Sequence, residues 1–181
     1  MHRERFLLLL EEARFHDPGS YGATSGAAEL LRALAADRDC AVAIATGGWR
    51  ATAAFKLAAA GLSELTGGLP WGTAEDGLSR DEILAAALAR SKVRYEQTGF
   101  SRIVLVGDAV WDVRTARRLG LAFLGVGAGE TADRLSAAGA YQVVADFADL
   151  DGARRALETA AVPRLPAPAP APRRSPGGPR P

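Results

Sequence analysis

Asp108 and Asp112 are two acidic residues whose spacing suits the binding of a metal ion. Asp108 comes directly after the apolar run 102–107, and Asp112 lies about one helical turn further along. Because ligands bind beyond the carboxyl ends of parallel strands, both carboxylates could approach one point there. Without a basic neighbour they repel each other unless a cation lies between them, and Mg²⁺ prefers such oxygen ligands. The pair therefore predicts a Mg²⁺ site; alternatively, Asp108 caps the following helix and Asp112 occupies its first turn.

Thr46 ends another apolar run, 40–46, and two glycines, Gly47 and Gly48, follow it. A hydroxyl group beside free backbone amides and the N-terminus of a helix can cradle a phosphate group. We therefore expect Thr46 and Gly47 to bind phosphate. Considered alone, the same segment also fits an ordinary N-cap threonine followed by two flexible glycines.

Arg80 is the basic residue best placed to join these groups, because it begins a predicted helix after a weakly patterned, glycine-rich segment. Its guanidinium group could reach the same crevice and make bidentate contacts to phosphate. Considered alone, it also fits an exposed arginine in the first turn of a helix. Trp49 and Trp111 each follow a strand end by a few residues; they could wall a pocket, although packing is the simpler interpretation.

The elements that must position these residues are strands alternating with helices. Ser79 and Glu82 have the spacing of a capping box, Ser25 is the expected N-cap of an earlier helix, and Gly61 and Gly120 follow helical segments. The run at 102–107 reads as the clearest buried strand. This alternation predicts an α/β fold, a Rossmann-like parallel sheet with flanking helices. The predicted helices cover 3–14, 25–37, 49–60, 80–97, 110–119, 130–138 and 148–161, and the predicted strands cover 40–46, 67–72, 102–107, 122–127 and 141–146.

The C-terminal segment 163–181 differs in composition from the rest of the chain. It contains eight of the ten prolines and four arginines but no acidic residue, which predicts an extended, disordered tail. Removing those four arginines from the 22 basic residues leaves 18 against 21 acidic residues, so residues 1–162 carry about −3. A domain with a slightly negative net charge does not attract nucleic acid or an anionic membrane, so neither is expected as a partner.

Cysteine content and hydropathy indicate the compartment. Cys40 is the single cysteine, so it cannot form a disulfide within the chain, and this composition suits a reducing compartment. No apolar run approaches the roughly 18 residues of a membrane span. The run at 6–10 is short and lacks a small-residue cleavage site, so it does not read as a signal peptide. We therefore expect a cytoplasmic protein.

The order of these segments resembles the haloacid dehalogenase-like hydrolase superfamily, in its phosphoglycolate-phosphatase-like branch, over about residues 25–160. The stretch CAVAIATGGWRATAAF resembles the segment around the second motif, and IVLVGDAVWDVRTARRLGLAFLGVGAG resembles the fourth motif with its flanks. The resemblance implies that Thr46 binds phosphate and that Asp108 and Asp112 lie near Mg²⁺. Arg80 is the best positional match to the basic residue of the third motif.

One part of the family pattern is missing from this sequence. The first motif, D-x-D-x-T/V, follows the first, central strand and supplies the nucleophilic aspartate and a general acid/base; nothing here matches it. By resemblance, 1–22 is a remnant of the cap helix and linker, 23–162 is the hydrolase-like core, and 163–181 is the tail. The first central strand and most of the cap are then absent, and the strand's place would lie between the strands ending at Thr46 and Asp108.

The resemblance implies a Mg²⁺-dependent phosphatase acting on a small phosphorylated metabolite. Family members transfer the phosphoryl group to an aspartate and then hydrolyse the acyl phosphate. Because no nucleophile is assignable, we expect the chain as given to be inactive. The alternatives are a non-catalytic phosphate- and Mg²⁺-binding or regulatory protein on the same scaffold, or an unrelated α/β binding domain. The sequence leaves the substrate and the oligomeric state open.

Overall fold

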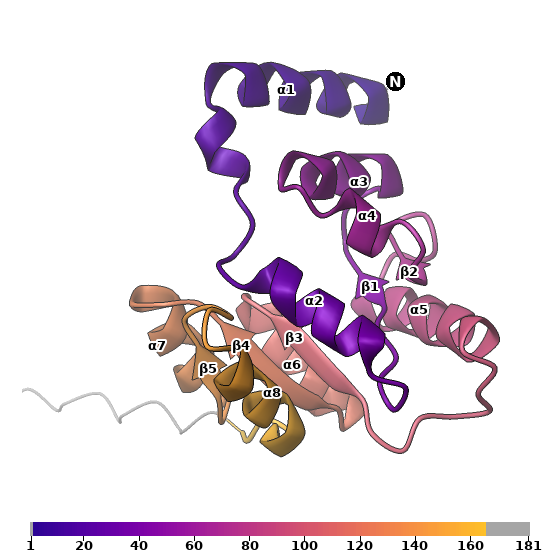
Figure 1. The fold of residues 1–181 in the computed structure, drawn as a ribbon, viewed down its shortest axis with the longest axis vertical. Helices are drawn as coiled ribbons and strands as arrows, with labels where there is room; N and C mark the ends of the chain where they lie inside the picture. Colours follow the sequence, from indigo (N-terminus) through magenta and orange to yellow (C-terminus); the bar gives the residue numbers. More distant parts are fainter. Residues whose placement is uncertain (1, 166–181) are drawn as a thin grey trace, which may run out of the picture.

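Helices and parallel strands alternate along the chain, which confirms the predicted α/β class (Figure 1). The computed structural model describes residues 2–165. The strands are β1 (Ile44–Ala45), β2 (Trp71–Gly72), β3 (Val104–Gly107), β4 (Ala122–Val126) and β5 (Val143–Val144). The helices are α1 (His2–His16), a 3₁₀ turn η1 (Pro18–Tyr21), α2 (Ala27–Ala36), α3 (Arg50–Ala59), α4 (Ser63–Thr66), α5 (Arg80–Arg94), α6 (Val110–Leu119), α7 (Glu130–Ala137) and α8 (Leu150–Thr159). None of these helices is long and apolar enough to cross a membrane.

The larger sheet has the strand order β3-β4-β5, and all of its pairs are parallel. β4 is the middle strand: Val104 of β3 pairs with Ala122, and Gly125 pairs with Val143 of β5. Two side chains of β4, Phe123 and Leu124, have no exposed surface. A parallel strand with neighbours on both sides and helices on both faces is expected to be buried in this way.

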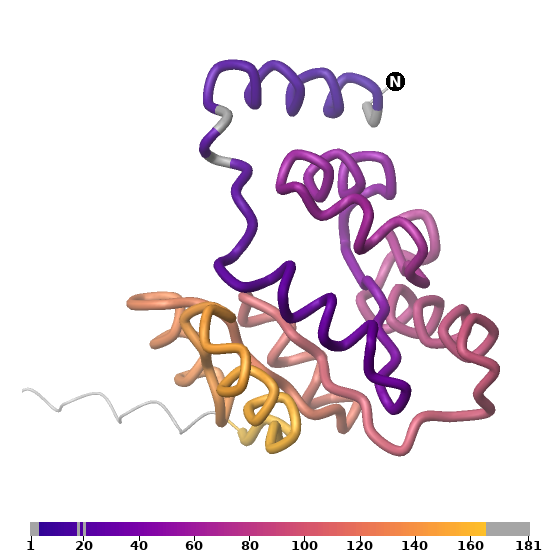
Figure 2. Tube along the Cα trace, in the orientation of Figure 1, coloured from indigo at the N-terminus to yellow at the C-terminus, as the bar shows by residue number. Residues whose placement is uncertain are grey.

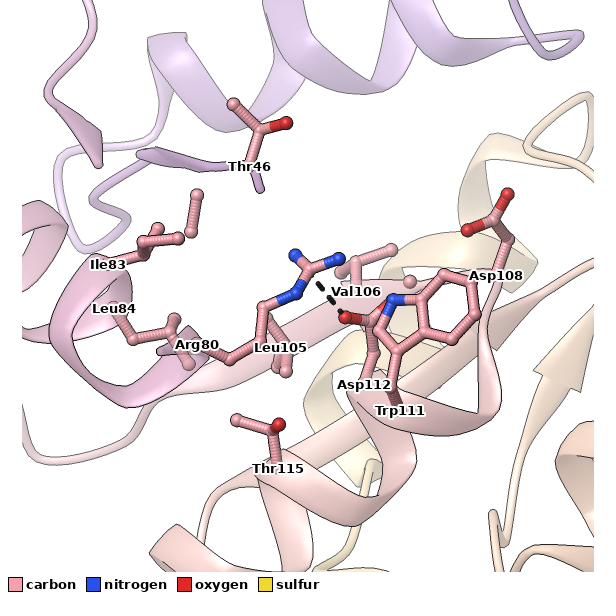
Figure 3. Close-up of a pocket in the computed structure, with 12 residues that line it drawn as sticks. Thr46, Arg80, Ile83, Leu84, Leu105, Val106, Asp108, Trp111, Asp112 and Thr115 are labelled. Carbon is pink, nitrogen blue, oxygen red and sulfur yellow. Dashed lines mark ion pairs between the residues drawn. The ribbon is translucent and has the colours of Figure 1, made fainter. Parts of the chain in front are cut away.

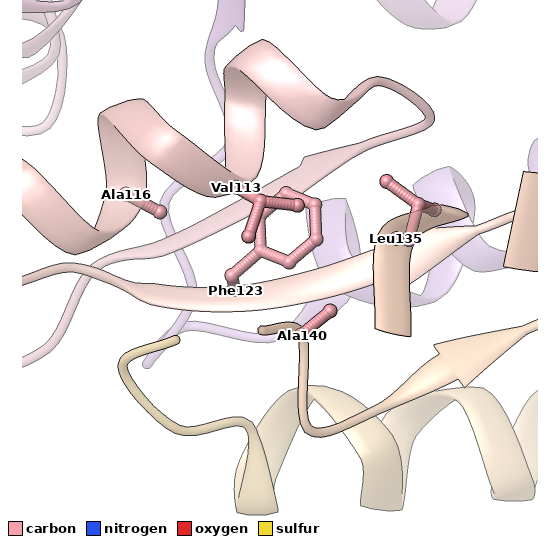
Figure 4. Close-up of a cluster of buried hydrophobic side chains, with 5 residues drawn as sticks. All are labelled: Val113, Ala116, Phe123, Leu135 and Ala140. Carbon is pink, nitrogen blue, oxygen red and sulfur yellow. The ribbon is translucent and has the colours of Figure 1, made fainter. Parts of the chain in front are cut away.

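Helices cover both faces of the larger sheet (Figure 1). On one face, α6 and α7 pack against β4 around a buried cluster (Figure 4), which consists of Val113, Ala116, Phe123, Leu135 and Ala140. On the other face, α2 and α8 pack together, and Leu30, Ala153 and Phe147 form a second cluster beside Val126 and Val144. The sheet is therefore the middle layer of a three-layer core.

The smaller sheet pairs β1 with β2, also in parallel, and rests on α5. Its most buried side chain is Trp71, which is 3% exposed and donates its indole N–H to the carbonyl of Thr66. A Cβ atom on Gly72 would lie only 2.0 Å from the carbonyl oxygen of Ile83. Glycine therefore lets the backbone of β2 approach α5 closely.

The two sheets are not joined to each other. Among the residues that the structure describes, β1 pairs only with β2, and β3 pairs with β4 on one side alone. This is the place where the family resemblance puts a further strand, and no described segment fills it. In particular, the apolar run 6–10 is helical, as predicted. α1 lies beside α3 and away from the larger sheet (Figure 2), where Phe6 contacts Trp49 edge to face.

Local sequence signals predicted several helix ends correctly. The hydroxyl of Ser79 accepts the backbone N–H of Glu82, whose carboxylate accepts the N–H of Ser79, so the capping box at the start of α5 is complete. Gly120 ends α6 with a φ of 66°, and Gly61 follows α3 with a φ of 73°. Glycine adopts this left-handed conformation without a steric penalty, which is why the ends were readable.

Three predictions about local structure were wrong. Ser25 does not cap α2, because the N-cap residue is Gly26 and no side chain caps there; the Ser25 carbonyl instead accepts the N–H of Phe147. The strand predicted over 40–46 is only two residues long, since just one of its edges has a partner. The buried strand predicted over 102–107 is shorter and only partly buried, because one edge of β3 has no neighbour.

The first residues of the predicted tail contact the rest of the fold. Pro163 is buried, and the backbone N–H of Arg164 donates to the carbonyl of Gly139. The guanidinium group of Arg164 also lies over the ring of Tyr141. These contacts fix the start of the segment predicted as disordered, whereas residues 166–181 lie outside the described part of the chain.

Candidate functional site

A cavity of about 250 Å³ between the two sheets (Figure 3) is lined by five of the residues that the sequence singled out: Thr46, Arg80, Asp108, Trp111 and Asp112. Gly47 and Trp49 do not line it. It opens where the carboxyl ends of β1 and β3 lie close to α5 and α6. This is the edge of a parallel sheet at which ligands bind. The cavity is lined by Ala45, Thr46, Arg80, Ile83, Leu84, Leu105, Val106, Gly107, Asp108, Trp111, Asp112 and Thr115.

Arg80 links the three elements around the cavity. Its guanidinium group forms an ion pair with the carboxylate of Asp112, with 3.7 Å between the charged atoms (Figure 3). The same group lies against Gly47, since its Cζ atom would be 3.5 Å from a Cβ there. Asp112 therefore has the basic neighbour that the sequence interpretation lacked. The Arg80 side chain is 33% exposed, which leaves N–H donors that a ligand can reach.

Asp112 is the more buried of the two candidate metal ligands. Burial raises the pKa of its carboxyl group; Arg80 opposes this shift, whereas the negative charge of Asp108 adds to it. A Cβ atom on Gly107 would lie 2.6 Å from Asp112 Oδ2, so the glycine at the end of β3 makes room for this carboxylate. The surroundings of Asp112 thus disfavour its ionised carboxylate, and a bound cation would stabilise that carboxylate.

Asp108 lies at the rim of the cavity and is exposed. In Figure 3 its carboxylate lies apart from the Arg80–Asp112 pair. It does not cap α6, because the N-cap residue is Ala109 and no side chain caps there, so the capping part of that alternative is wrong. Asp112 does lie in the first turn of α6, as the same alternative stated. Within the described residues, no three acidic, histidine or cysteine side chains converge on a metal position. The two aspartates could therefore supply only part of a set of oxygen ligands for a metal ion.

The hydrogen bonds at Thr46 and at the start of α3 differ from those of the phosphate-binding arrangement that the sequence predicted. The hydroxyl oxygen of Thr46 accepts the N–H of Gly48 at 3.1 Å, and the N-cap of α3 is Trp49, so Thr46 is not the N-cap. The first amide of α3, at Arg50, donates to both carboxylate oxygens of Glu75, at 3.0 and 3.2 Å. An internal carboxylate therefore already occupies part of this helix N-terminus.

The sequence interpretation missed two residues at the site. Glu75 comes from the loop before α5, and nothing in its local sequence indicates that it would reach α3. Thr115 lines the floor of the cavity with only 3% of its surface exposed, and its position four residues after Trp111 places both on one face of α6. Trp111 is 58% exposed beside the cavity, so the packing interpretation fails for it, whereas Trp49 packs against Phe6.

Comparisons with known proteins concern the family and the fold of the chain. Residues 79–150 match the HAD-hydrolase-like family, a range that contains Arg80, Asp108 and Asp112 but not Thr46. The fold is similar to the crystal structure of a conserved haloacid dehalogenase-like protein of unknown function from Agrobacterium tumefaciens, with a TM-score of 0.54 and 21% identity. The alignment covers 75% of this chain and 61% of that chain, so this chain spans less than two thirds of its structural relative. No curated protein matches the sequence.

Proposed function

We propose that this protein, which matches the HAD-hydrolase-like family over residues 79–150 and is similar in fold to a haloacid dehalogenase-like protein, binds Mg²⁺ and the phosphate group of a small phosphorylated metabolite. An Mg²⁺-dependent phosphatase of this kind would use the same contacts. The observation that carries the proposal is the convergence of Thr46, Arg80 and Asp112 on one cavity from three separate elements. A hydroxyl, a guanidinium and a carboxylate at the end of a parallel sheet are the groups that a phosphate and its cation need.

Asp108 and Asp112 are the residues that would hold Mg²⁺. Their donor atoms fit this ion, because Mg²⁺ prefers oxygen ligands and keeps several waters when the protein supplies only one or two carboxylates. The pKa of Asp112, raised by burial and by Asp108, supports the same assignment, since two nearby negative charges favour a cation. Bound Mg²⁺ would offset negative charge on the phosphate group.

Thr46, Gly47 and Arg80 are the residues that would hold the phosphate. The hydroxyl of Thr46 accepts a bond from Gly48 but keeps its own proton to donate. Arg80 lies against Gly47 and has five N–H donors, so its ion pair with Asp112 leaves donors for a ligand. Arg80 thus holds the anion close to the cation ligands.

The cavity offers no spare carboxylate for covalent catalysis. Apart from Asp108 and Asp112, no acidic side chain among the described residues lines it. A hydrolase that forms an acyl phosphate needs a further carboxylate in line with the phosphorus atom. We therefore expect the chain to bind a phosphate ester without hydrolysing it at an appreciable rate. Of the two candidate functions, an Mg²⁺-dependent phosphatase and a non-catalytic binding protein, this observation favours the second.

Calorimetric titration of inorganic phosphate in the presence of Mg²⁺ tests the binding proposal. We expect binding by the wild-type chain and loss of binding on Arg80→Ala, because the guanidinium group is the main positive charge at the cavity. Arg114→Ala is the matched control, since Arg114 is an exposed arginine of α6 that does not line the cavity. Equal affinity in both variants would contradict the assignment of Arg80.

Turnover of p-nitrophenyl phosphate separates the two candidate functions. We expect no Mg²⁺-dependent release of p-nitrophenol above the rate in buffer. Release that requires Mg²⁺ and disappears on Asp108→Asn would instead show that the chain is a competent phosphatase, and the nucleophile would then have to be sought among its own residues.

A further inference from the structure

Trp111 differs from the other two tryptophans of the chain in how its ring is used. Trp71 is 3% exposed and donates its indole N–H to a carbonyl, whereas Trp49 packs edge to face against Phe6. Trp111 is 58% exposed, and among the described residues its ring contacts no aromatic ring and its N–H makes no hydrogen bond. The indole group of Trp111 is therefore free to contact a ligand at the cavity.

α6 holds Trp111 in place beside the cavity. Val113 and Ala116, on a different face of the helix, have no exposed surface and pack against β4, so the helix cannot turn about its axis. Thr115 lies one turn after Trp111 and lines the same cavity. Because a tryptophan side chain has few rotatable bonds, contact with a ligand orders it at a low cost in conformational entropy.

The cavity has polar groups on one side and apolar surface on the other. Thr46, Arg80 and Asp112 supply the polar groups, whereas Trp111 and the 42% exposed Val106 supply apolar surface that is open to water. In Figure 3 the guanidinium group of Arg80 lies between Thr46 and the indole ring of Trp111. A phosphate ester held by Thr46 and Arg80 can therefore direct its organic part toward the indole ring.

The indole ring favours an uncharged aromatic group in the ligand. Aromatic rings attract each other in offset-stacked or edge-to-face arrangements beyond the effect of burying their surface, whereas a saturated group gains from burial alone. A positively charged organic group would be repelled by Mg²⁺ held at Asp108 and Asp112. These two effects together select an aromatic group without a charge.

The size of the cavity limits the organic group to one small ring. Its volume of about 250 Å³ lies below the range of roughly 300–1,000 Å³ that is typical of ligand pockets. A phosphate group and Mg²⁺ with its waters would fill much of the polar side. The remaining space beside Trp111 suits a single ring better than a nucleoside.

We propose that Trp111 stacks on the organic part of the ligand, and that the ligand is therefore the phosphate ester of an uncharged compound with a single aromatic ring. This inference rests on the proposed function, because Thr46 and Arg80 must bind the phosphate group for the ring to reach Trp111. Phenyl phosphate is a minimal ester of this class. Cyclohexyl phosphate is the matched non-aromatic ester, since its ring has the same number of carbon atoms but is not flat.

Calorimetric titration of the two esters into the full chain, in the presence of Mg²⁺, tests the inference. We expect phenyl phosphate to bind about three- to tenfold more tightly than cyclohexyl phosphate, because an aromatic pair contributes up to about tenfold beyond the burial of its surface. Equal affinities for the two esters would overturn the inference and leave the phosphate site standing. Binding of neither ester would overturn the proposed function together with the inference.

Three variants show whether Trp111 is the source of this preference for phenyl phosphate. Trp111→Leu should abolish the preference, because leucine keeps an apolar side chain without an aromatic face, and Trp111→Phe should keep most of it. Tyr141→Leu is the matched control: Tyr141 is 56% exposed and does not line the cavity, so the preference should not change. A preference that survives in Trp111→Leu, or that is lost equally in Tyr141→Leu, would overturn the assignment of Trp111.

Discussion

β3 and β4 are neighbouring strands of similar composition with different burial. β4 lies between two strands and under helices from both faces, and its Phe123 and Leu124 are fully buried. β3 has a strand on one side only and exposes 42% of Val106. Apolarity is a property of the strand itself, whereas burial depends on its neighbours. The molecule therefore has a packed half around β4, with α6 and α7, and a second half around β3 that ends at an open cavity.

The largest expected effect lies in the packed half. Phe123→Ala should lower the free energy of unfolding by about 3–5 kcal/mol, because it removes a ring at the centre of the α6–α7 cluster. Chemical denaturation followed by circular dichroism measures this change. A loss below about 1.5 kcal/mol would show that the side chains around Phe123 rearrange easily to fill the space. β4 would then not be packed more tightly than β3.

The glycines that pair across the two strands should respond differently to the same substitution. A Cβ on Gly125 would meet Val143 and Leu135 of the packed half, at 2.9 and 3.1 Å, so Gly125→Ala should cost about 1–3 kcal/mol of stability. A Cβ on Gly107 would meet the Asp112 carboxylate. Gly107→Ala should therefore lower the affinity for Mg²⁺, and it should lower the free energy of unfolding less than Gly125→Ala does. Denaturation and calorimetry of both variants check this; similar stability losses without an effect on Mg²⁺ would contradict it.

Val106→Ala should have a smaller effect than either change in β4. Its side chain is partly in water, so truncation should cost about 1 kcal/mol or less. The same denaturation experiment measures it. A loss as large as that of Phe123→Ala would mean that β3 is buried in solution, for example by another copy of the chain.

Wild type and Asp112→Asn should differ in how the free energy of unfolding depends on pH. Its folded-state pKa is raised, so its ionised form destabilises the fold, and the stability present below the usual pKa of 3.8 is lost as the pH rises through the raised value. Without Mg²⁺, Asp112→Asn should therefore be more stable than wild type at neutral pH. The difference should vanish as the pH falls below 3.8. Denaturation curves between pH 3 and 7 test this, and a difference independent of pH would refute the stated cause.

Sequence patterns predicted the parts of the molecule that depend on local interactions. The capping box at Ser79 and the left-handed Gly120 are set by residues within a turn of each other, and both helix ends were readable. The Arg80–Asp112 ion pair joins two helices, and Glu75 reaches α3 from a distant loop. Such contacts depend on how elements pack, which local patterns do not contain.

The composition of β3 mispredicted its burial for the same reason, although the family resemblance placed an absent strand beside it. Its run of valine and leucine is typical of a strand with two neighbours, and no feature of the run itself indicates that one neighbour is missing. The convergence of Thr46, Arg80, Asp108 and Asp112 on one cavity was more predictable, because residues that follow parallel strands gather at one edge of the fold.

Calorimetric titration of Mg²⁺ into the full chain tests the central claim most directly, which is that Asp108 and Asp112 form the cation-binding part of the site. We predict binding of one Mg²⁺ by the wild-type chain, its loss in Asp108→Asn, and its retention in Asp151→Asn, which removes an exposed aspartate from the first turn of α8. Absence of binding by the wild-type chain, or equal binding by both variants, would contradict the account.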